Sequence, residues 1–316
     1  MAGVPHHAAH QYIAKLLELG HKVAICEQMA DPSKVRGIVP REVVRVITPG
    51  LISDRDQLDA RANNWLAALE LGSGSVGVAL FDLSTGELAA TEVGDLARLL
   101  SELSRAAPRE ILVGSAPGVS DEGALAALRA TVPLAALRED PPVEDQDLAT
   151  DLGELSGDAG FAGALGRRAA ARVLRFARAC TPGSELPLRR IARWDPHAHM
   201  VIDSVAQRHL ELVESWSGLR QATLLGVIDD TQTAMGARLL RRRLLAPLLD
   251  VERIRRRHDQ VELFVVHSRL RADLRKCLAD VTDMERIVAR ATLGEANPRE
   301  LGSLRDGLSA SARGVE

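Results

Sequence analysis

The stretch GVIDDTQTAMGARLLRRRLLAPLLDVERIRRRHDQVEL, residues 226–263, decides what the rest of the chain is expected to form. Thr233 can cap a helix that begins at about Ala234, and Pro247 ends that helix because the proline ring removes a backbone donor and clashes with the preceding turn. Asp250 can then cap a second helix. The sequence therefore predicts two consecutive helices joined by a short turn.

Both predicted helices carry regular side-chain patterns. The apolar face of the first helix holds Ala237, Leu240 and Leu244, and its basic stripe holds Arg238, Arg241 and Arg242. Along the second helix, one face is formed by residues spaced three and four apart, namely Val251, Ile254, His258, Val261 and Val265. Such a repeat predicts a seam packed on another helix, with His258 as a core histidine that has one hydrogen-bonded ring nitrogen.

The same stretch resembles the core, or lever, domain of the MutS family of DNA mismatch-repair proteins. The positions in register with the family are Asp229, Thr231, Thr233, Met235, Gly236, Arg238, Pro247, Asp250, Ile254, Arg257, Asp259 and Val261. The segments 283–286 and 296–301 match the same core. Arg243 departs from the pattern, because the family usually has an aromatic residue there, and local packing is expected to differ at that point.

Composition bounds the class of protein. A chain of 316 residues is long enough for two domains or three small ones, and with 3% aromatic residues its cores must be built from aliphatic side chains, which favours helices. The three widely spaced cysteines, Cys26, Cys180 and Cys277, indicate reduced thiols. Neither a signal peptide nor a run of apolar residues long enough to span a membrane is present, so a cytoplasmic protein is expected.

The net charge of −3 is unevenly distributed along the chain. Residues 1–50 carry +2, residues 51–165 carry −13 and residues 166–316 carry +8. The acidic middle is not expected along a phosphate backbone, whereas the basic last part could face DNA or an acidic neighbour. Arginine stripes of this kind are, however, more often solvated or paired faces.

The first segment, residues 1–52, is predicted to be a helix around Tyr12 followed by strands at 22–27 and 42–48, too few strands for a sheet of its own. Segments around Pro5 and Glu27, and residues 43–50, match the end of the family's mismatch-binding domain. The family's Phe-x-Glu element, which contacts the mispaired base, does not occur in these 316 residues and is expected upstream.

The second segment, residues 53–158, is predicted to form three strands between Trp65 and Val93, then helix, strand and helix, and finally an acidic loop over 138–158. The phrase FDLSTGEL at 81–88 resembles the family's connector domain, which implies an RNase H-like fold.

The third segment, residues 159–316, is expected to be the first part of the α-helical core domain. Its predicted helices cover Phe161–Cys180, Asp203–Ser215 and Leu274–Leu293, and another begins at Asn297 and Pro298. Residues 186–193 and 199–202 are expected to be extended. The fold class is thus α/β followed by mostly α.

Three motifs bear on possible chemistry. No G-x-x-x-x-G-K-[ST] phosphate loop occurs, so this chain is not expected to hydrolyse ATP alone. Gly72–Gly77 fits G-x-G-x-x-G but precedes a strand, which predicts a hairpin loop rather than a pyrophosphate site. His6, His7 and His10 have no third ligand at suitable spacing and are expected to be an exposed helix start.

Asp82 suggests one enzymatic alternative, because RNase H-like nucleases place a metal-binding aspartate on the first strand. Two-metal chemistry needs several converging carboxylates, for which Glu87, Glu110 and Asp121 are the candidates. A nuclease would cleave DNA with Mg²⁺ or Mn²⁺ and lose that activity in Asp82→Asn.

The resemblance implies a role in DNA mismatch repair. The connector and core segments would transmit conformational changes between the DNA-binding site and the nucleotide-binding site of the intact protein. It implies no catalytic, cofactor or metal residue in this chain, and ATP and Mg²⁺ only in the intact family. The partners it implies are mismatched duplex DNA, a MutL-type protein and a second MutS subunit. The family-motif positions expected to be structural or interdomain are Pro5, Glu27, Asp82, Asp229, Thr231, Thr233, Gly236, Arg238, Pro247 and Asp250. The alternative is a free-standing module that binds the MutL-type partner without recognising DNA.

Overall fold

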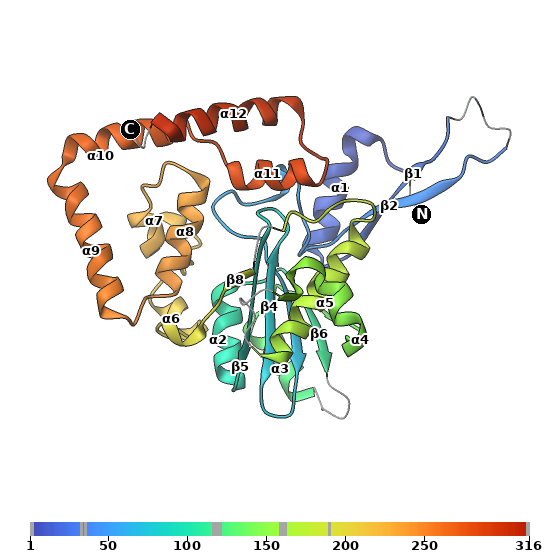
Figure 1. The fold of residues 1–316 in the computed structure, drawn as a ribbon, viewed down its shortest axis with the longest axis horizontal. Coiled ribbons are helices and arrows are strands. Elements are labelled where there is room, and N and C mark those ends of the chain that lie inside the picture. The colour runs from blue at the N-terminus through green and yellow to red at the C-terminus, as the bar shows by residue number, and fades with distance from the viewer. Residues whose placement is uncertain are drawn as a thin grey trace.

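The computed structural model describes residues 3–31, 34, 37–115, 122–157, 163–188 and 191–313. In this part of the chain an α/β region is followed by an α-helical region, as the sequence predicts (Figure 1). The N-terminal elements are α1 (His6–Glu18), β1 (Val23–Gln28) and β2 (Arg41–Ile47). The two strands pair antiparallel and extend away from the rest of the chain, while Ile13 and Leu17 of α1 pack near Ile47.

A six-stranded mixed sheet forms the centre of the α/β region. Its strands are β3 (Leu66–Leu71), β4 (Val76–Asp82), β5 (Glu87–Val93), β6 (Glu110–Ser115), β7 (Ala136–Glu139) and β8 (Ile191–Arg193). The order across the sheet is β7-β6-β3-β4-β5-β8. The predicted strands β3, β4 and β5 form an antiparallel meander, and Gly72–Gly77 includes the turn between the first two, where the Gly72 N–H donates to the Ser75 carbonyl at 3.0 Å.

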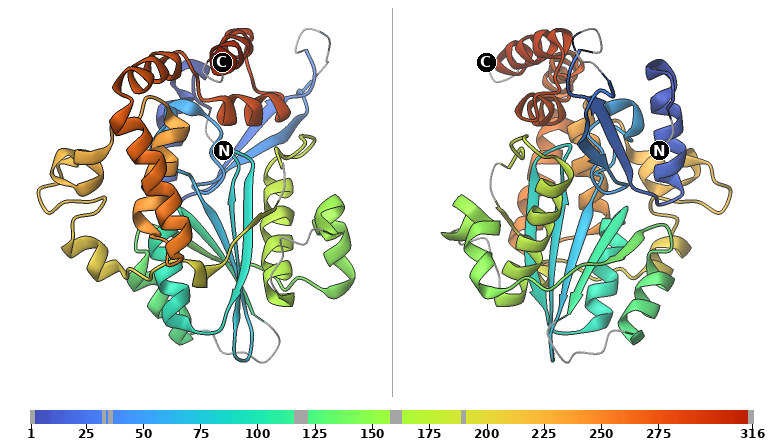
Figure 2. Two further views of the ribbon diagram at one scale, coloured as in Figure 1. Left: turned by 60° about the vertical axis from the view of Figure 1, so that its left-hand side comes forward. Right: turned by 90° about the vertical axis from the view of Figure 1, so that its right-hand side faces the viewer.

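Helices cover both faces of this sheet (Figure 2). They are α2 (Leu96–Ala106) and α3 (Glu122–Thr131) on one face and α5 (Ala164–Cys180) on the other, with α4 (Asp145–Leu152) outside α5. Since both faces are covered, every residue of β3 is buried. The contact with α5 is close, because a side chain at Gly77 would lie 2.1 Å from the Leu165 carbonyl.

Two expectations for this region were wrong. The acidic stretch 138–158 was expected to be a loop, but its described part, 138–157, holds the end of β7, α4 and a 3₁₀ turn, because Val143 and Leu152 bury their side chains. The helix expected to open the core domain, α5, instead packs on β3, β4 and β5, so the α/β region runs to β8 rather than to residue 158. Phe161, expected in that helix, lies outside the described residues.

The helical region follows in α6 (Ser204–His209), α7 (Leu224–Ile228), α8 (Ala234–Leu245), α9 (Val251–Val266), α10 (Ser268–Ala279), α11 (Met284–Thr292) and α12 (Pro298–Arg313). The predicted caps are present: Thr233 accepts from the Gly236 N–H at 3.0 Å, and Asp250 accepts from the Arg253 N–H at 2.9 Å. Asn297 and Glu300 form a reciprocal capping box at the start of α12.

Two predicted helix spans were wrong. The helix that follows Asp203 ends at His209 rather than Ser215, because Glu211 adopts φ of 45° and turns the chain. The predicted helix 274–293 is two helices, α10 and α11. Between them Val281 is buried and the Asp283 carboxylate caps α11, so a new helix begins there.

The predicted seam of α9 is also not observed. None of its residues is buried, and Val261 and Val265 are 61% and 64% exposed. His258 is likewise exposed rather than a core histidine. The reason is that α9 and α10 stand away from the sheet, and in the described part of the chain no helix buries this face (Figure 1).

Candidate functional site: the junction between the sheet and the helices

The segment 53–64, which leads into β3, is held against the helical region by two buried arginines. Arg238 of α8 is 2% exposed. It donates to the Ala60 carbonyl at 3.0 Å and forms a bidentate pair with Asp283 at 2.7 and 2.8 Å. Its guanidinium also donates to Glu285 at 2.7 Å. One side chain thus joins α8, α11 and the segment before the sheet.

Arg286 of α11 makes a second, similar connection. Its guanidinium donates to the Asp59 carbonyl at 3.0 Å and to the Ala62 carbonyl at 2.7 Å. The donors for these two carbonyls come from a helix more than 220 residues further along the chain. The two arginines therefore fix three carbonyls of segment 53–64 to the helical region.

At this junction Arg238 and Asp283 each favour the charged form of the other. Although burial by itself favours the neutral forms, the hydrogen bonds and charges of Asp283 and Glu285 raise the pKa of Arg238. Burial likewise opposes ionisation of Asp283, yet the Arg238 guanidinium lowers the pKa of that carboxyl below its ordinary value. Burial, followed by the charge of Arg238, lowers the pKa of Arg286. Arg238 and Asp283 are thus held in their charged forms.

We expect the junction to weaken in acid. Because the pKa of Asp283 is lower in the folded than in the unfolded chain, its contribution to stability is complete above the ordinary value of 3.8 and is lost as pH falls through the folded pKa. Urea unfolding measured at several pH values from neutrality downward should show a steeper loss of stability in acid for the natural chain than for Asp283→Asn. Equal slopes would contradict this assignment.

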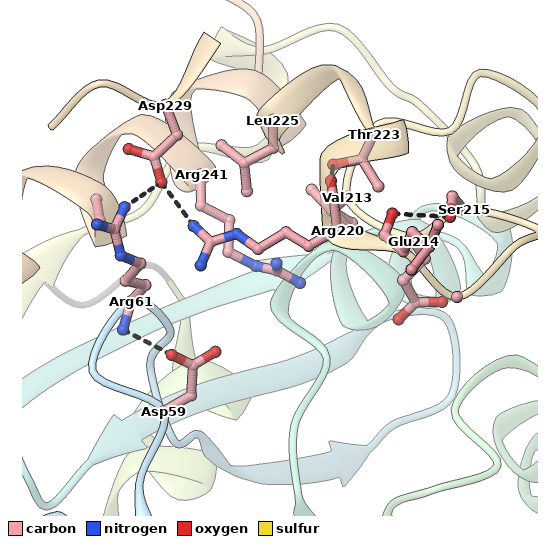
Figure 3. Close-up of a pocket in the computed structure, with 13 residues that line it drawn as sticks. Asp59, Arg61, Val213, Glu214, Ser215, Arg220, Thr223, Leu225, Asp229 and Arg241 are labelled. Carbon is pink, nitrogen blue, oxygen red and sulfur yellow. Dashed lines mark hydrogen bonds and ion pairs between the residues drawn. The ribbon is translucent and has the colours of Figure 1, made fainter. Parts of the chain in front are cut away.

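A second node lies around Asp229, at the end of α7 (Figure 3). Its carboxylate accepts from Arg61 at 2.5 Å and from Arg220 at 2.8 Å. It also accepts from the backbone N–H and the hydroxyl of Thr231, at 3.2 and 2.5 Å. Burial alone would raise the pKa of Asp229, but the Thr231 hydroxyl and the Arg61 guanidinium outweigh it and lower that pKa. The node joins segment 53–64 to the loop before α7.

These groups border a cavity of about 430 Å³. Its lining includes Asp59 and Arg61 from the segment before the sheet, Glu214 and Arg220 from the loop before α7, and Arg241 of α8. Figure 3 shows the side chains of Arg61, Arg220 and Arg241 directed into this space.

Two further contacts extend the junction. Arg242 of α8 donates to both carboxylate oxygens of Glu87, at the start of β5, at 2.6 and 2.8 Å. Glu295, which follows α11, accepts from Arg45 of β2 and from Ser53. The helical region is therefore tied to the N-terminal strands as well as to the sheet. The predicted basic stripe of α8 is largely a paired face: Arg238 and Arg242 bind carboxylates.

The structure gathers most of the motif residues of 226–263 near this junction. Asp229, Thr231, Thr233 and Gly236 form the turn and cap at the start of α8, and Arg238 is the buried arginine described above. At the other end of α8, the Pro247 carbonyl accepts from the Met200 N–H at 2.8 Å, and Asp250 caps α9.

Two motif residues lie elsewhere. Pro5 precedes α1 and is exposed. Glu27 is exposed on β1, where it pairs across the ladder with Glu42. The structure gives neither residue a contact with the junction in the part of the chain that it describes. Of the predicted histidines, His10 pairs with Asp54 at 3.0 Å and His7 is exposed. The side chain of His6 is outside the described set.

Asp82 is buried at the end of β4, and its carboxylate is fully used by hydrogen bonds. It accepts from the Asn63 amide at 2.8 Å, from the Asn64 N–H at 3.2 Å and from the Ser84 N–H and hydroxyl at 2.9 and 2.7 Å. The aspartate therefore holds the Ser84 turn and segment 53–64 in place. Of the other proposed metal ligands, Glu87 and Glu110 make their contacts elsewhere.

Those candidate carboxylates are bound elsewhere. Glu87 pairs with Arg242, and Glu110 pairs with Arg138 and accepts from the Gly50 N–H at 3.0 Å. Asp121 lies outside the described residues. Among the described residues no group of three His, Cys, Asp or Glu side chains is arranged to hold a metal ion. The residues present thus do not fit the two-metal site of a nuclease.

Sequence reasoning missed Arg61, Arg220 and Arg286 as junction residues. Asp283 and Arg286 belong to a segment that matched the family, which was a signal for their importance but not for their partners. Arg61 and Arg220 stand in no recognisable pattern, and their shared partner Asp229 is 168 and 9 residues away.

In the part of the chain that is described, no helix is long and apolar enough to cross a membrane.

Comparisons with known proteins agree with these observations. Three family models match: MutS domain I over residues 1–56, MutS domain II over 64–186 and MutS domain III over 205–315. The DNA mismatch repair protein MutS of Sorangium cellulosum is 54% identical over 332 aligned residues, covering 100% of this chain and 36% of that protein. Those of Symbiobacterium thermophilum and Methanothrix thermoacetophila are 40% and 38% identical, each over 98% of this chain and 36% and 34% of theirs.

The chain thus spans about 36% of the length of the first of these relatives. Among solved structures, T. thermophilus RuvC in complex with Holliday junction substrate matches with a TM-score of 0.27 and 15% identity, over 37% of this chain and 97% of that chain. A likeness of this size supports no statement about activity.

Proposed function

This chain belongs to the MutS family of DNA mismatch-repair proteins, and we propose that it supplies the connector and the first part of the core through which such a protein links its mismatch-binding part to its ATP-binding part. On this proposal residues 1–52 are the end of the mismatch-binding domain. The sheet region is an RNase H-like connector, and the helices from α6 onward are the beginning of the core. The connector assignment is supported by the strand arrangement, in which the meander β3–β5 is followed along the chain by the parallel strands β6 and β7.

The observation that carries the proposal is the buried junction. Arg238 and Arg286 donate from α8 and α11 to backbone carbonyls of segment 53–64, which leads directly into β3. A change in the position of either helix must therefore move this segment or break buried, charge-assisted hydrogen bonds. Such a connection suits a part that passes a conformational change from one domain to another.

We assign the proposed ligands and partners to the intact protein. Mismatched duplex DNA would be read by a Phe-x-Glu element, which does not occur in these 316 residues. ATP and Mg²⁺ are assigned to the intact protein, because these 316 residues hold no G-x-x-x-x-G-K-[ST] phosphate loop. The MutL-type partner would contact the connector, and dimerisation would involve other parts of the protein.

DNA binding tests this division of roles. The isolated chain should bind matched and mismatched duplexes with equal, weak affinity that falls steeply with added salt, because any contact would come from the arginine-rich helical region and phosphates alone. Fluorescence anisotropy with two duplexes that differ at a single base pair would measure this. A clear preference for the mismatched duplex would refute the proposal.

The alternatives gain no support. The named relatives are all MutS proteins, which does not favour a free-standing module that binds only the MutL-type partner. The nuclease alternative gains none either, because no three metal-binding side chains converge on Asp82 among the residues that the structure describes.

A further inference from the structure

Arg241 of α8 differs from the other arginines that line the cavity at the Asp229 node. Arg61 and Arg220 both bind the Asp229 carboxylate. In the part of the chain that the structure describes, no hydrogen bond or ion pair reaches the Arg241 side chain. It is nevertheless partly buried, and this burial lowers its pKa. The Arg241 guanidinium therefore keeps its hydrogen-bond donors available to a ligand that enters the cavity.

The surroundings of Arg241 show what kind of ligand could fit. Figure 3 shows the Arg241 side chain alongside that of Arg220, with the Arg61 guanidinium on the other side of the Arg220 guanidinium. The carboxylates of Asp59 and Glu214 belong to exposed residues and make no direct ion pair with Arg241, although their charges favour its ionised form. The one buried carboxylate, Asp229, already accepts four hydrogen bonds. The centre of the cavity therefore offers donors but no free buried acceptor.

We propose that Arg241, together with Arg220 and Arg61, binds a small tetrahedral oxyanion, namely phosphate or the phosphate group of a small monoester. Three guanidinium groups from three separate segments approach the space from different sides. A tetrahedral anion presents several oxygens and can accept from all three, whereas a carboxylate has only two. The cavity volume of about 430 Å³ leaves room for a substituent on the phosphate.

Binding would have a structural consequence. The anion would bridge segment 53–64, the loop before α7 and α8, all of which meet at this cavity. It would thereby add to the contacts that hold the helical region against the sheet. This inference does not depend on the proposed function, because it concerns only the side chains of this chain.

Isothermal titration calorimetry of the full chain with inorganic phosphate and with glycerol phosphate, at constant ionic strength, tests the proposal. Saturable binding is expected, and Arg241→Gln should weaken it about tenfold or more, the cost of a lost charge-assisted hydrogen bond. Arg241→Lys should give an intermediate loss, since an ammonium keeps the charge but not the planar fork.

Arg243→Gln is the matched control, because Arg243 is exposed on the same helix and should leave binding unchanged. Phosphate should also raise the unfolding temperature of the natural chain and of Arg243→Gln but not that of Arg241→Gln, which provides a second readout if the variants differ in stability. Absence of saturable phosphate binding by the natural chain would overturn the proposal. So would an equal loss in the control, or Arg241-dependent binding of duplex DNA without binding of the small anions.

Discussion

Replacing Arg238 with alanine is expected to reduce the free energy of unfolding by about 3–5 kcal/mol, because it leaves a buried carboxylate without its main partner. The Asp283 side chain is 6% exposed and depends on the bidentate pair with Arg238. The variant would also leave the Ala60 carbonyl without this donor. Urea denaturation followed by circular dichroism would measure the loss.

Two controls separate the junction from a general effect of removing an arginine. Arg243→Ala, on the same helix but exposed, should change the stability by no more than about 0.5 kcal/mol. A double-mutant cycle with Asp283→Ala should give a coupling energy well above zero, since the two side chains are in direct contact. Hydrogen exchange of segment 53–64 should become faster in Arg238→Ala alone. If Arg238→Ala behaved like Arg243→Ala, the junction would not be a structural connection.

The locally encoded parts of this structure could be predicted from the sequence. Thr233, Asp250 and Asn297 cap the helices that they were expected to cap, because a cap uses a side chain and a backbone N–H only two or three residues away. The meander β3–β5 was predictable for the same reason, since short turns and alternation are local features. Family motifs also indicated the region around α8 as important.

What could not be predicted depends on distant partners. The seam of α9 has a regular pattern, yet no residue of that helix is buried, because the described chain provides no helix that covers the seam. The helix α4 was not predicted, because its acidic sequence indicated a loop, although Val143 and Leu152 supply buried contacts. The acceptor of Arg238 in segment 53–64 is a backbone carbonyl 178 residues away, which no side-chain pattern can reveal.

A comparable loss is expected for Arg172→Ala in the core between α5 and the sheet. Arg172 is completely buried and donates to Glu70 of β3 at 2.6 Å and to the Asp140 carboxylate at 2.7 Å. A side chain at Gly114 would lie 1.8 Å from the Arg172 guanidinium, so the strand leaves space for it. Removing the arginine would leave the Glu70 carboxylate buried without a partner. The free energy of unfolding measured in urea should fall by about 3–5 kcal/mol.

Arg168, one turn earlier on α5, provides the comparison. It pairs with Asp145, whose side chain is 78% exposed, and Arg168→Ala should cost less than about 1 kcal/mol because water screens that pair. The double variant Arg172→Met with Glu70→Leu should be more stable than Arg172→Ala, since it removes both buried charges rather than one. Equal losses for Arg172→Ala and Arg168→Ala would mean that water reaches Glu70. The charge of that strand would then be solvated, and the close packing of α5 on the sheet would not depend on this ion pair.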